Sequence, residues 1–231
     1  MQLPHSINMD DELTQAVWRF NFRPDTYLHS SWLSAMEEGA VLAAIGGTQR
    51  GAGRLAQHLL TRLGVAENVF FDFRSPLAQI ALWNGEDIAR LAEQIGATLY
   101  CSLVKRVIAR DDIIRLRHEL GEDLYAFMHQ RAPALTHKLG KLPVLPRNLP
   151  LRQRIILTGL LCLHSAFSRF PAAFWKRLMF KLDRDWYIQW KRYAKQGVVL
   201  EAVSGECAVL AQKVAIEIKM SVGHDGKILF S

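Results

Sequence analysis

The stretch NGEDIARLAEQIGATLYCSLVKRVI, residues 84–108, decides the fold class. Its apolar residues recur three or four positions apart, which places them on one face of an α-helix. Asn84 suits the N-cap, acidic residues fill the first turn, and Lys105 and Arg106 fill the last turn, where both signs of charge favour the helix dipole. The stretch therefore predicts a long amphipathic helix that buries one face: Ile88, Leu91, Ile95, Leu99 and Leu103.

Similar signals of helix starts and ends lie on both sides of this stretch. Carboxylates open predicted helices at residues 10–20 and 111–135, the second continuing to about Pro133. Further N-caps and glycine stops occur at Ser30 or Ser31, Gly46, Gly64 and Ser75 with Pro76. We therefore expect an all-α protein, mainly α-helical, with a compact, bundle-like domain of many helices.

The last segment, GECAVLAQKVAIEIKMSVG, admits two structures. Its length and its apolar start favour a helix that Gly223 ends. Its β-branched centre, with the HDG turn at 224–226, is typical of a short C-terminal strand or hairpin. Helix and strand both stay open for residues 214–220.

A proline-rich stretch, KLGKLPVLPRNLP at residues 138–150, forbids a regular helix. It predicts a connector between an N-terminal helical lobe, residues 1–137, and a basic C-terminal helical lobe, residues 151–231. The two lobes can also pack as one domain.

The charge changes at the same place. Residues 138–200 hold 13 Lys or Arg and two Asp, whereas the rest of the chain is slightly acidic. Such a basic segment suits an acidic protein surface, an anionic membrane face or nucleic acid, and it also suits a solvated surface without a partner.

Compartment signals are few. No run of about 18 uncharged apolar residues is present, so no transmembrane helix is predicted, and the acidic N-terminus does not resemble a secretory signal. The three cysteines, Cys101, Cys162 and Cys207, are far apart and form no Cys-x-x-Cys pair. We therefore expect a reducing cytoplasm, with neither a disulfide framework nor a structural zinc site.

Three patterns resemble catalytic or binding motifs, and each has a simpler interpretation. GGTQRGAGR (46–54) lacks the Lys-Ser/Thr pair of a phosphate loop and predicts a flexible loop. Cys162 and His164 would point to different sides of a helix, and ELGED (119–123) predicts a solvated acidic patch. We expect no catalytic residues, cofactor, metal or small-molecule substrate, and an enzyme is the least favoured class.

Aromatic and basic residues interleave between residues 174 and 193. Stacking and phosphate neutralisation of this kind can bind single-stranded nucleic acid, so a basic helical nucleic-acid-binding regulator is the alternative function. The helical spacing of the aromatics favours core packing under a basic outer face. The candidates for that face are Lys176, Arg177, Lys181, Arg184, Lys191 and Arg192.

The densest short stretch is NFRPDTYLHSSWL, residues 21–33. Its proline fixes the entry into the next helix, and its large aromatic side chains are apolar anchors. These residues either pin the N-terminal segment onto the helical core or contact a partner, and both remain open. The candidates are Phe22, Pro24, Tyr27, His29 and Trp32.

The string Phe22-x-Pro24-x-x-Tyr27-Leu28-His29, followed by Trp32-Leu33, resembles the N-terminal signature of the SctK family. This family of type III secretion proteins includes the YscK, PscK, OrgA and MxiK types. Residues 63–65, 75–79, 88–104 and 174–182 are similar to later segments of YscK-type proteins. The resemblance covers most of the chain in order, and the proline-rich stretch and residues 183–200 depart from it.

The resemblance implies a largely helical, non-enzymatic adaptor without a cofactor, needed for effector secretion and virulence. It implies a place in the cytoplasmic sorting platform, at the cytoplasmic face of the inner membrane. The expected partners are the cytoplasmic domain of an SctD-type inner-membrane ring protein and an SctQ-type pod protein. The SctL-type stator and the export ATPase lie further inward, the membrane is approached only through the ring, and nucleic acid is not expected.

Overall fold

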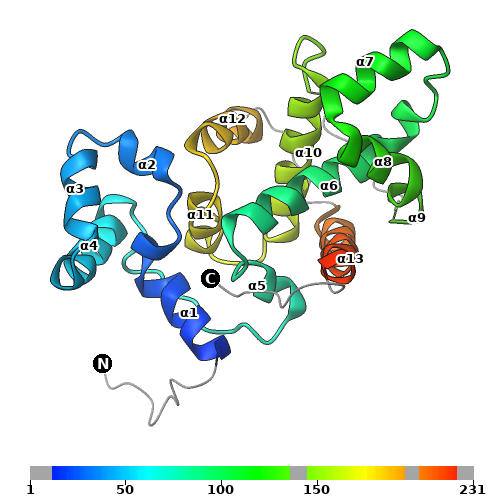
Figure 1. Ribbon diagram of the computed structural model, residues 1–231. Helices are drawn as coiled ribbons and strands as arrows, with labels where there is room; N and C mark the ends of the chain where they lie inside the picture. Colours follow the sequence, from blue (N-terminus) through cyan, green and yellow to red (C-terminus); the bar gives the residue numbers. More distant parts are fainter. Residues whose placement is uncertain (1–11, 136–144, 196–202, 223–231) are drawn as a thin grey trace. The chain divides into compact units, whose positions relative to one another are not determined.

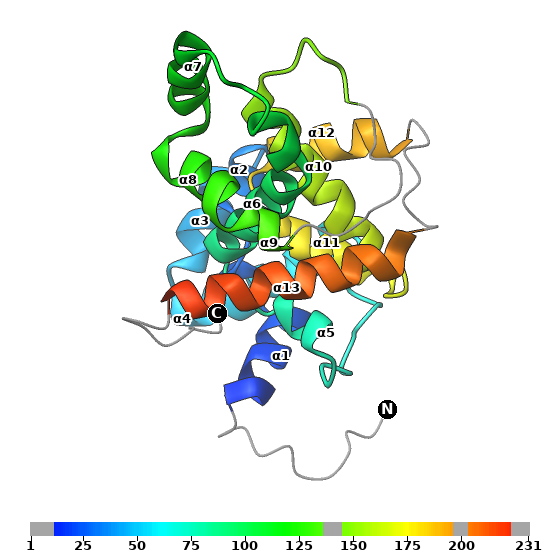
Figure 2. The ribbon, with the colours of Figure 1, turned by 90° about the vertical axis from the view of Figure 1, so that its right-hand side faces the viewer.

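A computed structural model describes residues 12–135, 145–195 and 203–222 of the chain (Figures 1 and 2). Within these ranges the chain forms helices joined by turns and contains no strand, which confirms the predicted all-α class. Residues 214–220 are helical, because α13 spans Ser204–Val222 without a break. The hairpin considered around residues 224–226, and most of the proline-rich connector, lie outside the described ranges.

The described chain groups into two compact units. Unit 1 contains residues 12–88 and 170–184, and unit 2 contains residues 89–135, 145–169, 185–195 and 203–222. Residues 170–184, which the sequence placed in a second lobe, thus belong to unit 1. The division into lobes 1–137 and 151–231 remains a prediction.

Unit 1 combines the short helices of the N-terminal part of the chain with α11, which comes from much later in the sequence. Its helices are α1 (Glu12–Phe22), the 3₁₀ helix η1 (Pro24–Thr26), α2 (Ser30–Ser34), α3 (Gly39–Gly46), α4 (Gln49–Arg62), α5 (Pro76–Ile80), the first turn of α6 (Gly85–Val104) and α11 (Ala172–Phe180). The predicted start of α5 is confirmed, since Ser75 Oγ accepts a hydrogen bond from the Ala78 amide at 3.1 Å.

The prediction of a flexible loop at residues 46–54 is wrong, because most of this segment is helical. Only Gly47 and Thr48 separate α3 from α4, and most of the glycine-rich segment forms the first turns of α4. Thr48 is the N-cap, and its Oγ1 accepts from the Gly51 amide at 3.0 Å. A Cβ on Gly51 would lie 2.1 Å from the Ile45 carbonyl oxygen, so glycine is needed there for close packing rather than for phosphate binding.

Two predicted helices are interrupted. The helix expected after Ser30 or Ser31 divides into α2 and α3, and its N-cap is His29 instead of a serine. The helix expected over residues 111–135 divides into α7 (Arg110–Leu120), α8 (Glu122–Gln130) and α9 (Ala132–Leu135). Gly121 adopts a φ of +83° between α7 and α8, a conformation that ends a helix and favours glycine.

Unit 2 contains α10 (Leu151–Ala166), most of whose residues are buried. It also contains α6 from Ala89 onward, the three helices α7, α8 and α9, α12 (Arg184–Lys195) from Asp185, and α13, which packs on α10 (Figure 2). The predicted N-cap of α6 is confirmed, because Asn84 Oδ1 accepts from the Asp87 amide at 2.8 Å. The helix ends at Val104, so Lys105 and Arg106 lie just beyond it.

Helices α6 and α10 touch through their backbones. A Cβ on Gly159 would lie 1.8 Å from the Ala92 carbonyl oxygen, and a Cβ on Gly96 would lie 1.9 Å from the Ile155 carbonyl oxygen. Because each glycine lacks a Cβ, it leaves room for a backbone carbonyl of the other helix. Apolar side chains on both sides of the crossing, such as Leu91, Ile95 and Ile155, are fully buried. Leu103, predicted for the buried face, is instead 53 % exposed.

The cysteines of unit 2 are buried thiols. Cys162 on α10 and Cys207 on α13 hydrogen-bond to each other, which raises the pKa of Cys162 and lowers that of Cys207. The ring of His164 packs against that of Trp190, with 4.8 Å between the centroids.

Candidate functional site

The segment 20–33 lies against the C-terminal end of α11 in unit 1. Pro24 is buried and opens η1, as expected for a proline at the first position of a helix. The His29 amide donates to the Phe180 carbonyl at 2.8 Å. Trp32 is buried, donates from Nε1 to the Leu182 carbonyl at 2.9 Å, and packs edge-on against Phe180. The motif thus fastens the N-terminal segment to α11.

His29 and Ser31 organise the turn after η1. The Ser31 amide donates to His29 Nδ1 at 3.3 Å, so the histidine caps α2. The Ser31 hydroxyl in turn accepts from the Arg184 amide at 2.9 Å. These contacts give His29 a structural position in the motif, and its role as a partner contact stays a prediction.

An aromatic cluster lies beneath the motif. Phe20 is buried and its ring lies 5.4 Å from Phe73 and 5.3 Å from Phe174, measured between centroids. Phe70 lies 5.0 Å from Phe174 and 5.4 Å from Phe170. Edge-to-face aromatic pairs at these separations are attractive beyond the burial of their area. The cluster joins α1, the 68–74 segment and α11.

Arg177, on α11, is buried and holds this cluster together from within. Its guanidinium donates to the carbonyls of Asn68 at 2.5 Å, Val65 at 2.7 Å and Asn21 at 3.3 Å. Burial lowers the pKa of Arg177, and the nearby Tyr27 hydroxyl opposes that shift. The planar fork of arginine is suited to such a task, because it can reach several acceptors at once.

Lys181, one turn further along the chain, is also buried. Its Nζ donates to the Trp83 carbonyl at 2.6 Å and lies 5.1 Å from the centroid of the Tyr27 ring and 5.9 Å from that of Phe20. Burial lowers the pKa of Lys181 to about 7. Burial also raises the pKa of Tyr27, whose hydroxyl donates to the Phe20 carbonyl at 2.9 Å. The ring of Tyr27 therefore covers the buried amino group of Lys181.

Replacing Lys181 with methionine should change how stability depends on pH. In the unfolded chain this lysine keeps its proton up to its ordinary pKa of 10.5, whereas the folded chain releases it near pH 7. Between these values the unfolded state binds more protons, so the free energy of unfolding of the wild type rises with pH. Below that window both states are protonated and the burial penalty is fully present.

The stability difference, wild type minus Lys181→Met, should therefore rise by an amount on the order of 3 kcal/mol between about pH 6 and pH 10. Urea unfolding at a series of pH values measures it. Lys105→Met, at an exposed position, is the control for the loss of one positive charge. Parallel pH profiles for the wild type and Lys181→Met would contradict the expectation.

Phe22 contacts other aromatic residues than Tyr27 and Trp32 do. It is half-buried, and its ring lies 6.3 Å from Trp18 and 6.2 Å from Phe71. Trp18 is 38 % exposed and Phe71 is 57 % exposed. Arg23 adds its guanidinium 5.8 Å from the Trp18 ring and pairs with Asp25 at 2.8 Å. We call Trp18, Phe22 and Phe71 the aromatic surface.

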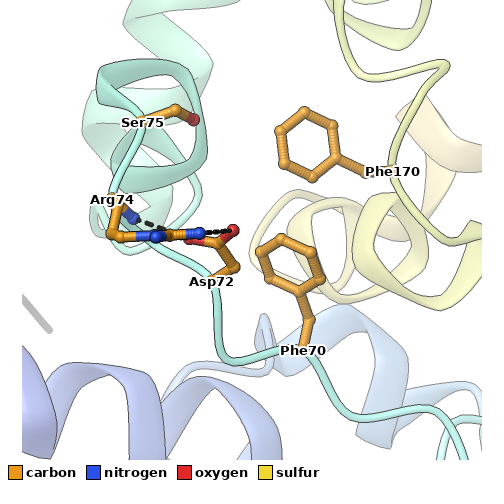
Figure 3. Close-up of a pocket in the computed structure, with 5 residues that line it drawn as sticks. All are labelled: Phe70, Asp72, Arg74, Ser75 and Phe170. Carbon is orange, nitrogen blue, oxygen red and sulfur yellow. Dashed lines mark hydrogen bonds and ion pairs between the residues drawn. The ribbon is translucent and has the colours of Figure 1, made fainter.

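A shallow hollow of about 530 Å³ lies beside Phe70, the residue that precedes Phe71 in the chain (Figure 3). The rings of Phe70 and Phe170 form one side, and Asp72 and Arg74 form a two-point ion pair on the other, with an N···O distance of 2.8 Å. Ser75 uses its hydroxyl to cap α5. The polar groups of the hollow are thus already paired within the chain, which suits an apolar contact better than a reaction.

Only part of the predicted basic face is exposed. Arg177 and Lys181 are buried, so their assignment to an outer surface was wrong, because backbone carbonyls and aromatic rings of unit 1 enclose them. Lys176 and Arg184 are half-buried, and Lys191 and Arg192 on α12 are exposed. A role in binding a partner stays a prediction for these four.

The aromatic residues of 174–193 mostly belong to the cores. Five of the seven, Phe174, Trp175, Phe180, Trp190 and Tyr193, are buried, so their rings are not available for stacking on bases. Within the described ranges, no cluster of three or more metal-ligand side chains is present, and no helix is long and apolar enough to span a membrane.

The comparison with protein families agrees with the resemblance of the motif. A sequence model of the family YOP proteins translocation protein K (YscK) matches residues 14–227. The chain belongs to the YscK family. No curated protein and no solved structure matches the chain significantly.

Membership of the YscK family confirms the family predicted from the motif and makes the chain a type III secretion protein, with a role in protein transport. YscK is a family of secretion accessory proteins and not a known enzyme family. The match includes the whole segment 20–33, α11 with its buried Arg177 and Lys181, and the aromatic surface. Both the buried and the exposed sides of the motif therefore lie inside the family region.

Sequence reasoning missed two residues of the aromatic surface in this YscK chain, Trp18 and Phe71. A signal was present for each. Trp18 stands four positions before Phe22, so a helix brings the two side chains together. Phe71 belongs to the run VFFDF, residues 69–73, in which alternate side chains of an extended segment point to opposite sides. Phe70 accordingly packs in the cluster, while its neighbour Phe71 is exposed. Phe73 also packs in the cluster, because a tight turn, in which the Phe73 amide donates to the Phe71 carbonyl at 3.1 Å, interrupts the alternation.

Proposed function

We propose that this chain is a non-enzymatic structural adaptor of the type III secretion sorting platform, acting at the cytoplasmic face of the inner membrane. It links the cytoplasmic domain of an SctD-type ring protein to an SctQ-type pod protein, and through that protein it is coupled to the SctL-type stator and the export ATPase. The observation that carries the proposal is the YscK family match over residues 14–227.

The aromatic surface supports this role and indicates one contact site. Exposed tryptophan and phenylalanine side chains that lie together are typical of protein interfaces, because they bury much apolar area with little loss of side-chain freedom. Arg23 stands at the edge of the same surface, and arginine is also enriched at interfaces. The hollow lined by Phe70 and Phe170 provides a neighbouring apolar depression.

The exposed basic residues are the second part of the proposal. Lys191 and Arg192 on α12, with the half-buried Lys176 and Arg184, are candidates for the more acidic of the two partners. Charges at such positions raise the association rate and make it depend on salt. Arg177 and Lys181 do not belong to this set, since reversing their charge would disrupt the interior of unit 1.

The double variant Trp18→Ala, Phe71→Ser should weaken binding to one of the two platform proteins by at least about tenfold. The measurement is calorimetric titration of the full chain with the purified SctD-type cytoplasmic domain and, separately, with the purified SctQ-type protein of the same bacterium. Effector secretion should fall in parallel in cells.

Ile108→Ser, Ile114→Ser is the matched control, since both isoleucines are exposed apolar residues of unit 2. Circular dichroism and the unfolding midpoint should be unchanged in both double variants. If the wild-type chain binds neither platform protein, the adaptor role is wrong. If it binds both and the aromatic variant binds equally well, the role stands and the aromatic surface is not the contact.

A further inference from the structure

Helix α13 carries a second apolar stripe on its outer side. Its inner side packs in the core of unit 2 through Cys207, Leu210, Val214 and Ile218, all of which are buried. Val209, Ile216 and Met220 are instead 42 %, 57 % and 69 % exposed. A surface helix normally places polar residues opposite its buried face, so apolar side chains on both faces are unusual.

The outer residues form one continuous line. Val209, Lys213, Ile216 and Met220 are separated by four, three and four positions, which is the spacing of the seam residues in a pair of packed helices. The line runs along about three turns of α13, from its middle towards its C-terminal end. This geometry fits another helix lying alongside.

Lys213 is the exposed charge in the middle of the stripe. Within the described part of the chain no carboxylate pairs with it. The carboxylate of Glu217, one turn further on, is already paired with Arg131 of the same unit. A positive charge with apolar residues on both sides selects a partner with a negative charge at the facing position.

A second copy of the chain fits this stripe poorly. Two α13 helices that pack in parallel and in register would place Lys213 against Lys213, and like charges at such a contact disfavour pairing. An antiparallel pair centred on the stripe would place each Lys213 against Ile216 of the other copy, with no acid at the facing position. A lipid surface also suits the stripe poorly, because interfacial helices present a broad apolar face flanked by several Lys and Arg, whereas this stripe has three apolar side chains and one lysine. The charge and the spacing together favour a helix of another protein.

We propose that the outer stripe of α13, namely Val209, Lys213, Ile216 and Met220, binds an amphipathic helix of a partner protein that carries an Asp or Glu facing Lys213. The stripe lies in unit 2, whereas the aromatic surface lies in unit 1, so the chain has two chemically different contact surfaces. This inference rests on the proposed function only for the expectation that the partner is a platform protein.

Photo-crosslinking in the native bacterium tests the proposal. The full chain carries benzoylphenylalanine in place of Met220, and the same residue in place of Ile114 on α7 is the control. The expected result is a cross-link from position 220 to a helix that contains Asp or Glu. A cross-link to a second copy, to lipid or to another part of the same chain, or no cross-link, would overturn the proposal.

A charge swap then decides whether Lys213 selects the partner. Lys213→Glu should weaken the affinity of the full chain for the cross-linked protein by at least about tenfold, and changing the facing acid of that protein to Lys should restore most of it. Lys213→Gln should have an intermediate effect. Equal affinities for the wild type and Lys213→Glu would refute the assignment.

Two features keep this test separate from that of the adaptor role. Lys213 is exposed, so its variants should unfold at the wild-type urea concentration, and Ile216→Ser provides a second variant that removes apolar contact without changing charge. If the chain binds neither the SctD-type domain nor the SctQ-type protein, the adaptor role fails. A successful charge swap with a different protein would still confirm the α13 surface.

Discussion

Replacing Gly159 with alanine should destabilise unit 2 by about 3 kcal/mol or more, an unusually large effect for the addition of one methyl group. The added Cβ would lie 1.8 Å from the Ala92 carbonyl oxygen and 3.1 Å from the Gly96 amide nitrogen. Both are backbone atoms of α6, so no side chain can rotate away to make room. The two helices would have to separate along the most buried part of α10.

Urea unfolding followed by circular dichroism measures this loss, and hydrogen exchange of the α6 and α10 amides locates it. Gly205→Ala on α13 is the control, because a Cβ there meets nothing within 4 Å. That control should leave stability unchanged or raise it by about 0.5–1 kcal/mol, since alanine favours a helix over glycine. Equal midpoints for Gly159→Ala and the wild type would show that α6 and α10 are not in backbone contact.

Replacing Arg177 with methionine should destabilise unit 1 by about 3 kcal/mol or more. Methionine keeps an unbranched apolar stem, but it cannot donate to the carbonyls of Asn68, Val65 and Asn21. Those acceptors would lose their donor in the interior, where an unpaired polar group is expensive. Arg177→Lys should recover part of the loss, because an ammonium group keeps the charge but lacks the planar fork.

Hydrogen exchange of residues 20–27 and 65–70 should reveal the change locally, while the amides of α10 and α13 keep their protection. Arg192→Met on α12 is the matched control, since Arg192 is exposed and its loss should change stability by no more than about 0.5 kcal/mol. If Arg177→Met and Arg192→Met behave alike, the buried guanidinium does not hold unit 1 together.

Local chemistry made much of the fold predictable. Asn84 and Ser75 accept hydrogen bonds from backbone amides in the first turns of their helices, and both caps depend only on residues within four positions. The apolar periodicity of residues 88–104 likewise needs no knowledge of distant contacts. The all-α class followed from such signals.

Long-range packing decided what the sequence could not show. Gly51 resembles a loop residue, yet its glycine is required by the Ile45 carbonyl of the preceding helix. Gly121 stands within a continuous helical pattern, and its positive φ separates α7 from α8. In each case a glycine is compatible with both a helix and a turn, and the packing of the surrounding backbone decides which of the two forms.

The candidate site shows the same limit. Arg177 stands on the amphipathic helix α11 and Lys181 is its C-cap, both beside aromatic residues, a pattern that usually places basic side chains in solvent. Their burial depends on carbonyl groups of residues about 100 positions or more away in the chain, such as Asn68 and Trp83. The family motif was visible in the sequence, whereas the direction in which each aromatic side chain points was not.

The long sequence separation within unit 1 has a consequence for protein synthesis. The Trp32 indole bonds to the carbonyl of Leu182, 150 positions later, so residues 12–88 leave the ribosome well before α11 exists. At roughly 5–20 residues per second, the aromatic side chains of the first segment wait on the order of ten seconds for their partner helix. During that interval the nascent chain exposes an apolar, aggregation-prone surface that a chaperone can bind. A truncated gene that stops near Pro146 would leave it exposed permanently.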